Sequence, residues 1–255
     1  MRGLSGRGVL VSGGTSGIGL AAAQRFLEEG CRVFVTGHEA EALERALETL
    51  GEAGELAGGL LLDVRDREAV DAVVAAADEA CEGLTVLANN AGIARRTPFL
   101  EIGADDWREV LDVNLTGMFA VGQAFARRLV AEERTGAIVN MASTNAFGGE
   151  EDYAHYNAAK GGVVQLTRSM AVELGRQGVR VNALCPGYID TPLNSGIADR
   201  LGAGFADRYA DERIPLGRVG TVVEVAACYA FLASEEASFV HGTTLVVDGG
   251  QLAVM

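Results

Sequence analysis

The chain has 255 residues, of which 49% are hydrophobic, and its 21 Lys and Arg residues against 35 Asp and Glu residues give a formal net charge of −14. A chain of this length can bury a large core, while the negative charge disfavours a nucleic acid or an anionic membrane as the main partner. The apolar stretch from Val222 to Ala233 is interrupted by Glu224 and is too short to span a bilayer, so we expect a soluble protein.

The cysteines and histidines indicate where the protein works and what it does not bind. The four cysteines are scattered without a Cys-x-x-Cys pair, which is typical of reduced thiols in the cytoplasm and does not suggest zinc. They are Cys31, Cys81, Cys185 and Cys228, and the three histidines, His38, His155 and His241, also lack the spacing of metal ligands. No signal-like segment precedes the first apolar run and no linker divides residues 1–255. We therefore expect one cytoplasmic domain with no metal site.

In chain order, short β-rich runs alternate with longer helical runs. Most strand runs are continuous stretches of Val, Ile and Leu, as expected for strands covered on both faces in a parallel sheet. The predicted strands are Val9–Ser12, Arg32–Thr36, Gly59–Leu62, Leu84–Ala88, Ala137–Met141, Arg180–Leu184 and Thr243–Val247. The predicted helices are Ile18–Glu29, Glu39–Leu50, Asp66–Cys81, Asp105–Ala131, Tyr153–Gly175 and Val222–Ala233. The alternation predicts βαβ units with right-handed crossovers and hence an α/β fold.

The segment from Pro192 to Arg213 breaks this alternation. It is polar and helix-prone, with a glycine pair in Leu201-Gly202-Ala203-Gly204. It lies where a lid over a pocket would be inserted. We therefore predict a substrate lid at about residues 192–213.

The first βα turn reads Ser12-Gly13-Gly14-Thr15-Ser16-Gly17-Ile18-Gly19. Glycines at 13, 17 and 19 permit positive φ, close approach of the backbone to a pyrophosphate, and tight packing of the next helix. The N-terminal N–H groups of that helix would face the phosphates. Because the turn follows a strand and opens a helix, it predicts a dinucleotide site. Its Gly-x-x-x-Gly-x-Gly spacing differs from the commoner Gly-x-Gly-x-x-Gly.

Tyr156 and Lys160 form the most informative pair in the chain. Residues four apart share a helix face, and a cation beside a phenol favours the phenolate, so we expect the pKa of Tyr156 to fall below about 10. Lys160 is the only lysine of the chain. This points to a specific role, because a compact ammonium can tune a neighbour where guanidinium cannot. Tyr153 is a poorer candidate, since the residue four positions later is Asn157.

Further motifs stand in order along the chain. They are Leu62-Asp63-Val64, Asn89-Asn90-Ala91-Gly92, Val113-Asn114-Leu115, Ser143, Pro186-Gly187 with Thr191, Pro215-Leu216-Gly217-Arg218 and Val247-Asp248-Gly249-Gly250. With the glycine turn and the Tyr-Lys pair, they make nearly the whole chain resemble the short-chain dehydrogenase/reductase family. Two departures are Ser12, where a threonine is usual, and Met141-Ala142-Ser143, where a Ser-Ser ending is commoner. The resemblance implies a single Rossmann-like, doubly wound domain with a seven-stranded parallel sheet of order 3-2-1-4-5-6-7 and helices on both faces.

The resemblance also implies an NAD(P)-dependent oxidoreductase that interconverts a secondary alcohol and a ketone by hydride transfer. Tyr156 would be the general acid in reduction and the base in oxidation, which contributes roughly 10²- to 10⁴-fold. Lys160 would lower the pKa of the phenol and hold the nicotinamide ribose. Ser143 would donate a hydrogen bond to the substrate oxygen, and Asn114 would anchor a water that links Lys160 to solvent.

Cofactor contacts follow from the same resemblance. Asp63 would accept from the adenine amine, Val64 would pack on the adenine, and Asn90 and Gly92 would line the adenosine ribose. The expected contacts are Gly13, Thr15, Ser16, Gly17, Ile18, Gly19, Gly37, His38, Asp63, Val64, Asn90, Ala91, Gly92, Tyr156, Lys160, Pro186, Gly187, Ile189 and Thr191. Cys185 is expected to lie near the cofactor as a small apolar filler.

The sequence leaves the choice between NAD and NADP open. Gly37 stands where NAD-selective members of the family usually carry an acid for the ribose hydroxyls. The arginine that usually clamps a 2′-phosphate is also missing, and Ser16 and His38 stand where NADP-dependent members often carry basic residues. These residues favour NADP over NAD only slightly.

The substrate is the second open point. Glu150-Glu151-Asp152 and the charged lid suggest a polar small molecule such as a sugar, polyol or hydroxy acid, although a solvated acidic loop explains them equally well. One alternative is a 3-oxoacyl-[acyl-carrier-protein] reductase, for which Arg127-Arg128 could supply part of a basic docking patch. Another is a non-catalytic protein that senses NAD(P) and binds a protein partner, but the complete set of catalytic residues argues against it.

Apolar side chains on the helix after Tyr156 predict an oligomer. The helix carries Val163, Val164, Leu166, Met170, Ala171 and Leu174, more apolar surface than one side of a sheet needs. We predict that this helix and Asp105–Ala131 form a two-fold dimer interface. The C-terminal strand would make a second contact, giving a homodimer or a homotetramer.

Overall fold

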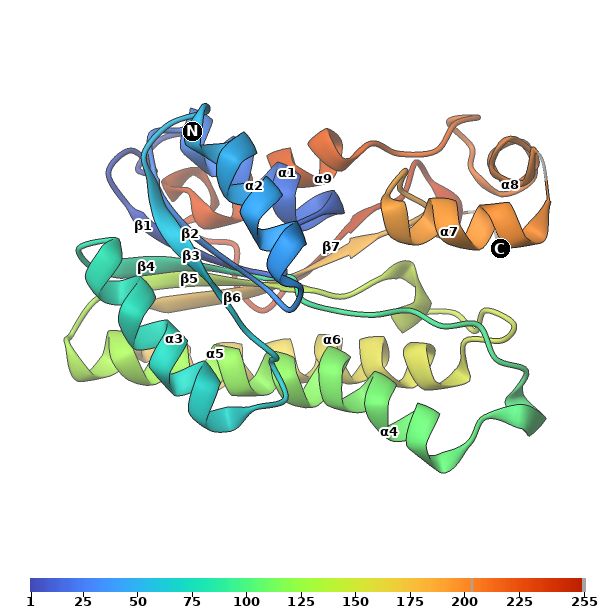
Figure 1. Cartoon of the computed structure of the whole chain (residues 1–255), viewed down its shortest axis with the longest axis horizontal. Helices are drawn as coiled ribbons and strands as arrows, with labels where there is room; N and C mark the ends of the chain where they lie inside the picture. The colour runs from blue at the N-terminus through green and yellow to red at the C-terminus, as the bar shows by residue number, and fades with distance from the viewer. Residues whose placement is uncertain (203, 254–255) are drawn as a thin grey trace.

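A parallel sheet forms the middle layer of the molecule (Figure 1). The structure, a computed structural model, describes residues 1–202 and 204–253, except for the side chains of residues 197–201. The strands are β1 (Gly8–Ser12), β2 (Arg32–Gly37), β3 (Leu56–Leu61), β4 (Leu84–Asn89), β5 (Gly136–Met141), β6 (Val179–Pro186) and β7 (Thr244–Val247). In the described residues they form a 7-stranded sheet of order β3-β2-β1-β4-β5-β6-β7 in which every pair is parallel. The predicted fold and strand order are therefore confirmed.

Helices cover both faces of this sheet. On one face lie α1 (Gly17–Glu28), α2 (Ala40–Gly51) and α9 (Val222–Ala233) (Figure 1). On the other face lie α3 (Arg67–Ala80), α4 (Ala104–Leu111), α5 (Met118–Ala131) and α6 (Ala154–Leu174). The segment predicted as a lid forms α7 (Pro192–Leu201) and α8 (Phe205–Arg213), and Ala203 of its glycine pair lies outside the described residues.

Two elements differ from the prediction. The strand expected at Gly59–Leu62 begins earlier, at Leu56, because Leu56 pairs with Val33 of β2 through a register shift. The glycine-rich start of β3 does not look like a strand in isolation, so neighbouring pairing decides it. The helix expected as one element at Asp105–Ala131 contains a π-helical stretch, Asp112–Gly117, between α4 and α5.

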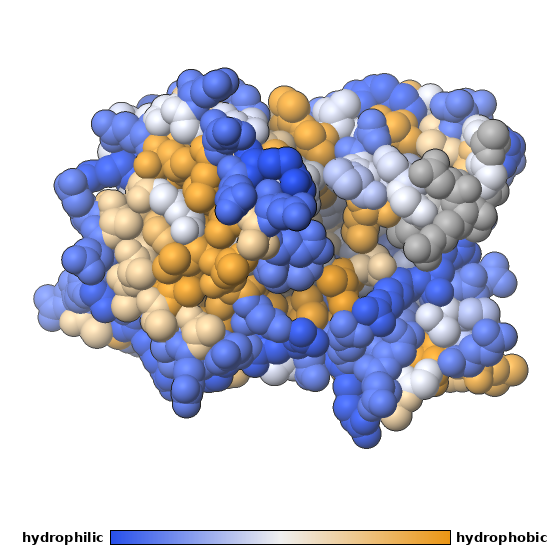
Figure 2. Space-filling view, in the orientation of Figure 1, coloured by the Kyte–Doolittle hydropathy of each residue, from blue (hydrophilic) through white to orange (hydrophobic). Residues whose placement is uncertain are grey.

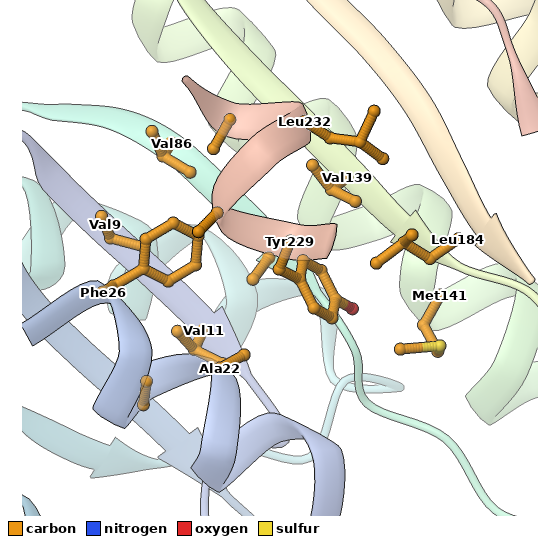
Figure 3. Packing of buried hydrophobic residues seen from close by; sticks show 14 of the residues in the cluster. Val9, Val11, Ala22, Phe26, Val86, Val139, Met141, Leu184, Tyr229 and Leu232 are labelled. Carbon is orange, nitrogen blue, oxygen red and sulfur yellow. The ribbon is translucent and has the colours of Figure 1, made fainter. Parts of the chain in front are cut away.

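A hydrophobic layer between the sheet and helices α1 and α9 packs next to the first βα turn. Figure 3 shows Phe26 of α1 and Tyr229 of α9 packed against strand residues such as Val11 and Val139. Phe26 and Tyr229 are fully buried. Burial of such large side chains contributes roughly 1.5 to 3 kcal/mol each. This packing therefore holds β1 and α1, the two elements that the turn connects, in place.

The surface over β3 carries an apolar patch. Figure 2 shows orange side chains gathered where Figure 1 draws this edge strand. Leu60 and Leu61 of β3 are 42% and 50% exposed.

Within the described residues, no helix is both long and apolar enough to cross a bilayer.

Candidate active site

A cavity of about 560 Å³ runs along the carboxyl ends of the central strands. It lies where the strand order reverses between β1 and β4, the usual ligand crevice of a doubly wound sheet. Figure 2 shows a hollow between the surface over α7 and the rest of the molecule. The residues that line the cavity include Gly13, Thr15, Ser16, Gly17, Ile18, Gly37, His38, Asp63, Val64, Asn90, Ala91, Gly92, Asn114, Ser143, Tyr156, Lys160, Pro186, Gly187, Ile189 and Thr191. The sequence singled out every one of these residues.

The glycine turn forms one end of the cavity. Gly13 and Gly17 have φ values of +65° and +51°, and a Cβ on Gly13 would lie 2.8 Å from the Cα of Ala91. Helix α1 begins at Gly17, and the side chain of its N-cap, Ser16, makes no capping hydrogen bond. The first N–H groups of α1 are thus left for a ligand, and an anion such as a pyrophosphate fits them. Gly19 does not line the cavity. A Cβ there would lie 2.0 Å from the carbonyl oxygen of Gly13, so a glycine lets the turn pack closely on α1, and its expected cofactor contact stays a prediction.

Hydrogen bonds fix this turn to the loop after β4. The Ser12 hydroxyl accepts from the backbone N–H groups of Asn90 (3.0 Å) and Ala91 (3.3 Å). The side-chain amide of Asn90 donates to the carbonyl oxygen of Gly13 (2.9 Å). Ser12 therefore supplies the hydroxyl for which the family usually uses threonine.

The ends of β2 and β3 form the part of the cavity where an adenosine would lie. A Cβ on Gly37 would approach the Cγ2 atom of Thr15 to 2.4 Å, so Thr15 occupies the space that a side chain at position 37 would need. The carboxylate of Asp63 accepts a bifurcated hydrogen bond from Nε and a second hydrogen bond from Nη2 of Arg65, and this hydrogen bonding lowers the pKa of Asp63. An adenine amine would therefore share Asp63 with Arg65, a partner that the sequence did not indicate.

Ser143, Tyr156 and Lys160 meet in the middle of the cavity. Ser143 follows β5, and Tyr156 and Lys160 lie on α6. The ammonium of Lys160 lies 5.5 Å from the centroid of the Tyr156 ring and donates to the carbonyl oxygen of Met141 (2.9 Å). Lys160 is only 2% exposed.

The predicted fall in the pKa of Tyr156 is wrong in this structure. Burial raises the pKa of Tyr156 to about 12, while a hydrogen bond with Ser143 opposes that rise. Burial also lowers the pKa of Lys160 to about 8. Desolvation disfavours the charged form of each group, an effect that the spacing alone does not reveal.

Asn114 enters the site from the π-helical stretch. Its amide donates to the carbonyl oxygens of Ile93 and Val110, each at 2.9 Å, and its oxygen accepts from the N–H of Ile93 (3.3 Å). A Cβ on Gly92 would lie 2.6 Å from that oxygen and 3.5 Å from the ammonium of Lys160, which places Asn114 beside Lys160. A π-bulge inserts one extra residue into a helix and often occurs at functional sites. The expected water between Asn114 and Lys160 stays a prediction.

The other end of the cavity is lined by residues that were not among the individually expected catalytic and cofactor contacts. They include Asn145, Glu150, Tyr188, Phe205, Tyr209 and Gln251. The rings of Tyr188, Phe205 and Tyr209 form a cluster with centroids 4.9 to 6.3 Å apart. The only sequence signal was the acidic run around Glu150 and the position of the lid segment.

The remaining singled-out residues lie outside the cavity or on its rim. Cys185 is fully buried and does not line the cavity, and burial raises the pKa of its thiol to about 12. His155 is buried with its Nε2 atom 3.3 Å from Asp106, and His241 contacts the carbonyl oxygen of Ala171. Over the described part of the chain, no group of three or more His, Cys, Asp or Glu residues could hold a metal ion.

Comparisons with known proteins show which proteins this chain is similar to. The model of the family described as enoyl-(acyl carrier protein) reductase matches residues 13–251. The 3beta-hydroxysteroid dehydrogenase 1 of Eggerthella lenta is 39% identical over 97% of this chain and 94% of its own length. The galactitol 2-dehydrogenase (L-tagatose-forming) of Cereibacter sphaeroides is 42% identical over 97% of this chain and 95% of its own length. The 3-oxoacyl-[acyl-carrier-protein] reductase FabG of Vibrio cholerae is 34% identical over 98% of this chain and 99% of its own length.

A solved structure with a bound coenzyme is also similar. It is a protein from Agrobacterium tumefaciens that carries the provisional name 2-deoxy-D-gluconate 3-dehydrogenase, crystallised with NADP. The two chains superpose with a TM-score of 0.88 at 40% identity, over 98% of each chain.

Proposed function

The chain belongs to the short-chain dehydrogenase/reductase family, and from that premise we propose how its site works. The protein is an NAD(P)-dependent oxidoreductase that interconverts a secondary alcohol and a ketone by hydride transfer. The observation that carries the proposal is the convergence of Ser143, Tyr156 and Lys160 in a cavity that continues to the glycine turn.

The residues of the cavity fit a nicotinamide dinucleotide. The N–H groups at the start of α1 would hold the pyrophosphate, and Val64, Asn90 and Gly92 would surround the adenosine. Pro186, Ile189 and Thr191 would fix the nicotinamide amide. The nicotinamide, when bound, accepts or supplies the hydride.

Tyr156 handles the proton of the reaction. In reduction its hydroxyl donates a proton to the carbonyl oxygen of the substrate, and in oxidation its phenolate accepts the proton of the alcohol. Ser143, which shares a hydrogen bond with Tyr156, orients the substrate oxygen. Lys160 holds the nicotinamide ribose and, as a cation, stabilises the phenolate. Asn114 fixes the loop around Ile93 beside Lys160 and anchors the water that relays protons to solvent.

The coenzyme in this proposal is NADP, with NAD also used. The NADP-bound relative from Agrobacterium tumefaciens supports this choice. The end of β2 carries no carboxylate that would repel a 2′-phosphate, because position 37 is a glycine packed against Thr15. His38 lines the same part of the cavity and offers a hydrogen-bond donor.

The substrate in this proposal is a polar small molecule such as a sugar, polyol or hydroxy acid. The relative named galactitol 2-dehydrogenase supports it. The relative named 3-oxoacyl-[acyl-carrier-protein] reductase keeps an acyl substrate as the alternative. Arg128 weakens that alternative, since Asp78 and Glu132 already pair with it (2.8 and 3.1 Å) and reduce the charge of the expected docking patch.

Helices α7 and α8 would act as the lid, because Asn194, Phe205 and Tyr209 face the cavity from them. We also propose a cytoplasmic location, in keeping with four free cysteines in the described residues.

Turnover with a panel of substrates tests the function. Ketones, sugars, polyols, hydroxy acids and acyl thioesters are offered with NADPH or NADP and with NADH or NAD, and reduced nicotinamide is followed by absorbance. We expect turnover of polyols or ketoses above that of acyl thioesters. Turnover of acyl thioesters alone would favour the carrier-protein reductase, and no turnover of any compound would favour the non-catalytic sensor.

A further inference from the structure

A chain of hydrogen bonds leads from the catalytic serine to a carboxylate at the substrate end of the cavity. The hydroxyl of Ser143 donates to the amide oxygen of Asn145 (3.1 Å) and accepts from its backbone N–H (3.2 Å). The amide nitrogen of Asn145 donates to the Oε2 atom of Glu150 (3.0 Å) and to the side-chain oxygen of Asn157 (2.8 Å). Both amide hydrogens of Asn145 are thereby used, so Asn145 orients Glu150 rather than contacting a substrate.

Glu150 faces the cavity with acceptor capacity to spare. It lines the cavity together with Tyr156, Tyr188 and Tyr209, and its charge contributes to the raised pKa of each of these phenols. A carboxylate has about four lone-pair sites. The hydrogen bond from Asn145 uses one of these sites, which leaves acceptors of the Glu150 carboxylate for a substrate.

Two arginines of the loop after β4 are already neutralised. Arg95 pairs with Asp106 (3.1 Å) and Glu109 (2.8 Å). Arg96 pairs with Asp152 (3.0 Å), and its guanidinium lies over the ring of Tyr153. A substrate that carries a carboxylate would therefore meet the negative charge of Glu150 before it met an unpaired arginine of this loop.

Aromatic rings line the cavity together with Glu150. Tyr188 and Tyr209 lie 4.9 Å apart by ring centroid, and Phe205 lies 5.8 Å from Tyr209. A polyhydroxylated carbon chain presents C–H groups on one side and hydroxyls on another. Such a molecule would place its C–H groups on these rings and its hydroxyls on Glu150.

We propose that Glu150, oriented by Asn145, binds substrate hydroxyls and selects neutral polyols and ketoses over the corresponding hydroxy acids. This inference rests on the proposed function and names the substrate class of the same site. A carboxylate that accepts from hydroxyls forms charge-assisted hydrogen bonds, which are about twice as strong as neutral ones. A carboxylate on the substrate would instead be repelled by the negative charge of Glu150.

Matched substrates test the proposal. Sorbitol and gluconate share a carbon skeleton and differ in one end group, and galactitol and galactonate form a second pair. We expect the wild type to favour each polyol over its acid in kcat/KM. Glu150→Gln keeps the shape and the acceptor for Asn145 but removes the charge. It should lower the polyol-to-acid ratio by at least about tenfold, chiefly by raising KM for the polyol.

Glu151→Gln is the matched control, because Glu151 carries the same charge one residue away and does not line this cavity. It should leave the ratio within about twofold, which separates a contact from a general field effect. A wild type that favours the acids, or a Glu150→Gln variant with an unchanged ratio, overturns the proposal. Turnover of cyclohexanol or a hydroxysteroid but of no polyol overturns it too and leaves the reaction class intact. No turnover of any alcohol refutes the proposed function itself.

Discussion

Burial works against the charged forms of both central catalytic residues. Tyr156 has its pKa raised to about 12 and Lys160 has its pKa lowered to about 8, each chiefly by desolvation. At neutral pH the phenol of Tyr156 is therefore uncharged, while Lys160 still carries its proton below a pH of about 8. A neutral phenol suits reduction, because in that direction Tyr156 gives a proton to the substrate.

Tyr156→Phe removes the proton donor and leaves the ring in place. We expect kcat to fall by at least about 10²-fold while the Kd for the dinucleotide stays nearly unchanged, since only the proton transfer is lost. Steady-state kinetics and coenzyme titration by fluorescence measure the two quantities.

Tyr153→Phe is the control for Tyr156→Phe. The Tyr153 ring lies 5.8 Å from that of Tyr156, but the resemblance assigns no proton to it. We expect a loss of less than about fivefold there. If Tyr156→Phe keeps more than about a tenth of the wild-type kcat, the assignment of the acid is wrong.

Lys160→Met should change how stability depends on pH. A lysine pKa lowered from 10.5 in the unfolded chain to about 8 in the fold means that the unfolded state binds more protons between these pH values. Wild-type stability then rises with pH in this window through Lys160, whereas the variant lacks that rise. The free energy of unfolding of the variant relative to wild type should drop by about 2 kcal/mol between pH 7.5 and 9.5, measured with urea.

Comparing the two proteins cancels the other groups that titrate in the same range, such as the buried thiols. Arg127→Met serves as a control for loss of a cation, because Arg127 is exposed. The difference between that variant and wild type should stay constant over the same pH range. A constant difference for Lys160→Met as well would mean that Lys160 keeps an ordinary pKa.

At the scale of elements, the π-helical stretch between α4 and α5 places Asn114 in the site. Asn114→Ala removes this donor from two carbonyl oxygens, the half-buried one of Ile93 and the buried one of Val110. We expect a loss of about 1 to 3 kcal/mol in the free energy of unfolding. We also expect kcat to fall by at least about tenfold, because the proton relay through Asn114 is broken.

Asn182→Ala separates these two effects. Asn182 is also buried, donates to the carbonyl oxygen of Val240 and accepts from the N–H of Thr243, away from the cavity. Its loss should destabilise the protein to a similar extent but spare kcat. Equal losses of kcat in both variants would show that Asn114 acts only through stability.

The ends of β1 and β2 are coupled through Thr15 and Gly37. A single Gly37→Asp change would force its Cβ to 2.4 Å from the Thr15 side chain. We therefore combine Gly37→Asp with Thr15→Gly. The new carboxylate should accept from the ribose hydroxyls of NAD and repel the 2′-phosphate of NADP, shifting the NAD/NADP ratio of kcat/KM toward NAD by at least about tenfold.

Thr15→Gly alone is the control for the double variant and should leave the coenzyme ratio nearly unchanged. The wild type should turn over with both coenzymes. A wild type more than about a thousandfold selective for either one, or a double variant with unchanged preference, would show that the end of β2 does not contact the ribose.

At the scale of the molecule, the fold explains which apolar side chains remain for a partner. Val163, Val164 and Ala171 of α6 are buried in the monomer itself, so the surplus expected from the sequence is partly used internally. Val172 on α6 and Phe119 on α5 are exposed instead, by 85% and 41%. The proposed two-fold interface therefore rests on these two side chains.

Light scattering at micromolar protein should give two or four times the chain mass of 26.6 kDa. Val172→Glu buries a charge in the proposed interface and should dissociate it. Val223→Glu on α9 is the control, because Val223 is also exposed but lies on the opposite face of the sheet. A monomeric mass for the wild type, or an unchanged mass for Val172→Glu, contradicts this interface.

The sequence by itself determined the glycine turn and the alternation of strands and helices, because these depend on patterns within a few residues. Its resemblance to a known family implied the strand order and the expected catalytic residues after β5 and on α6, and the rule that parallel strands bring their carboxyl ends together placed the crevice. Only the tertiary structure decided the aromatic wall from the lid, the contacts of Glu150, the π-helical stretch and the direction of the Tyr156 pKa. Each of these depends on which distant side chains share a space and how much water they exclude, and neither quantity is written in local spacing.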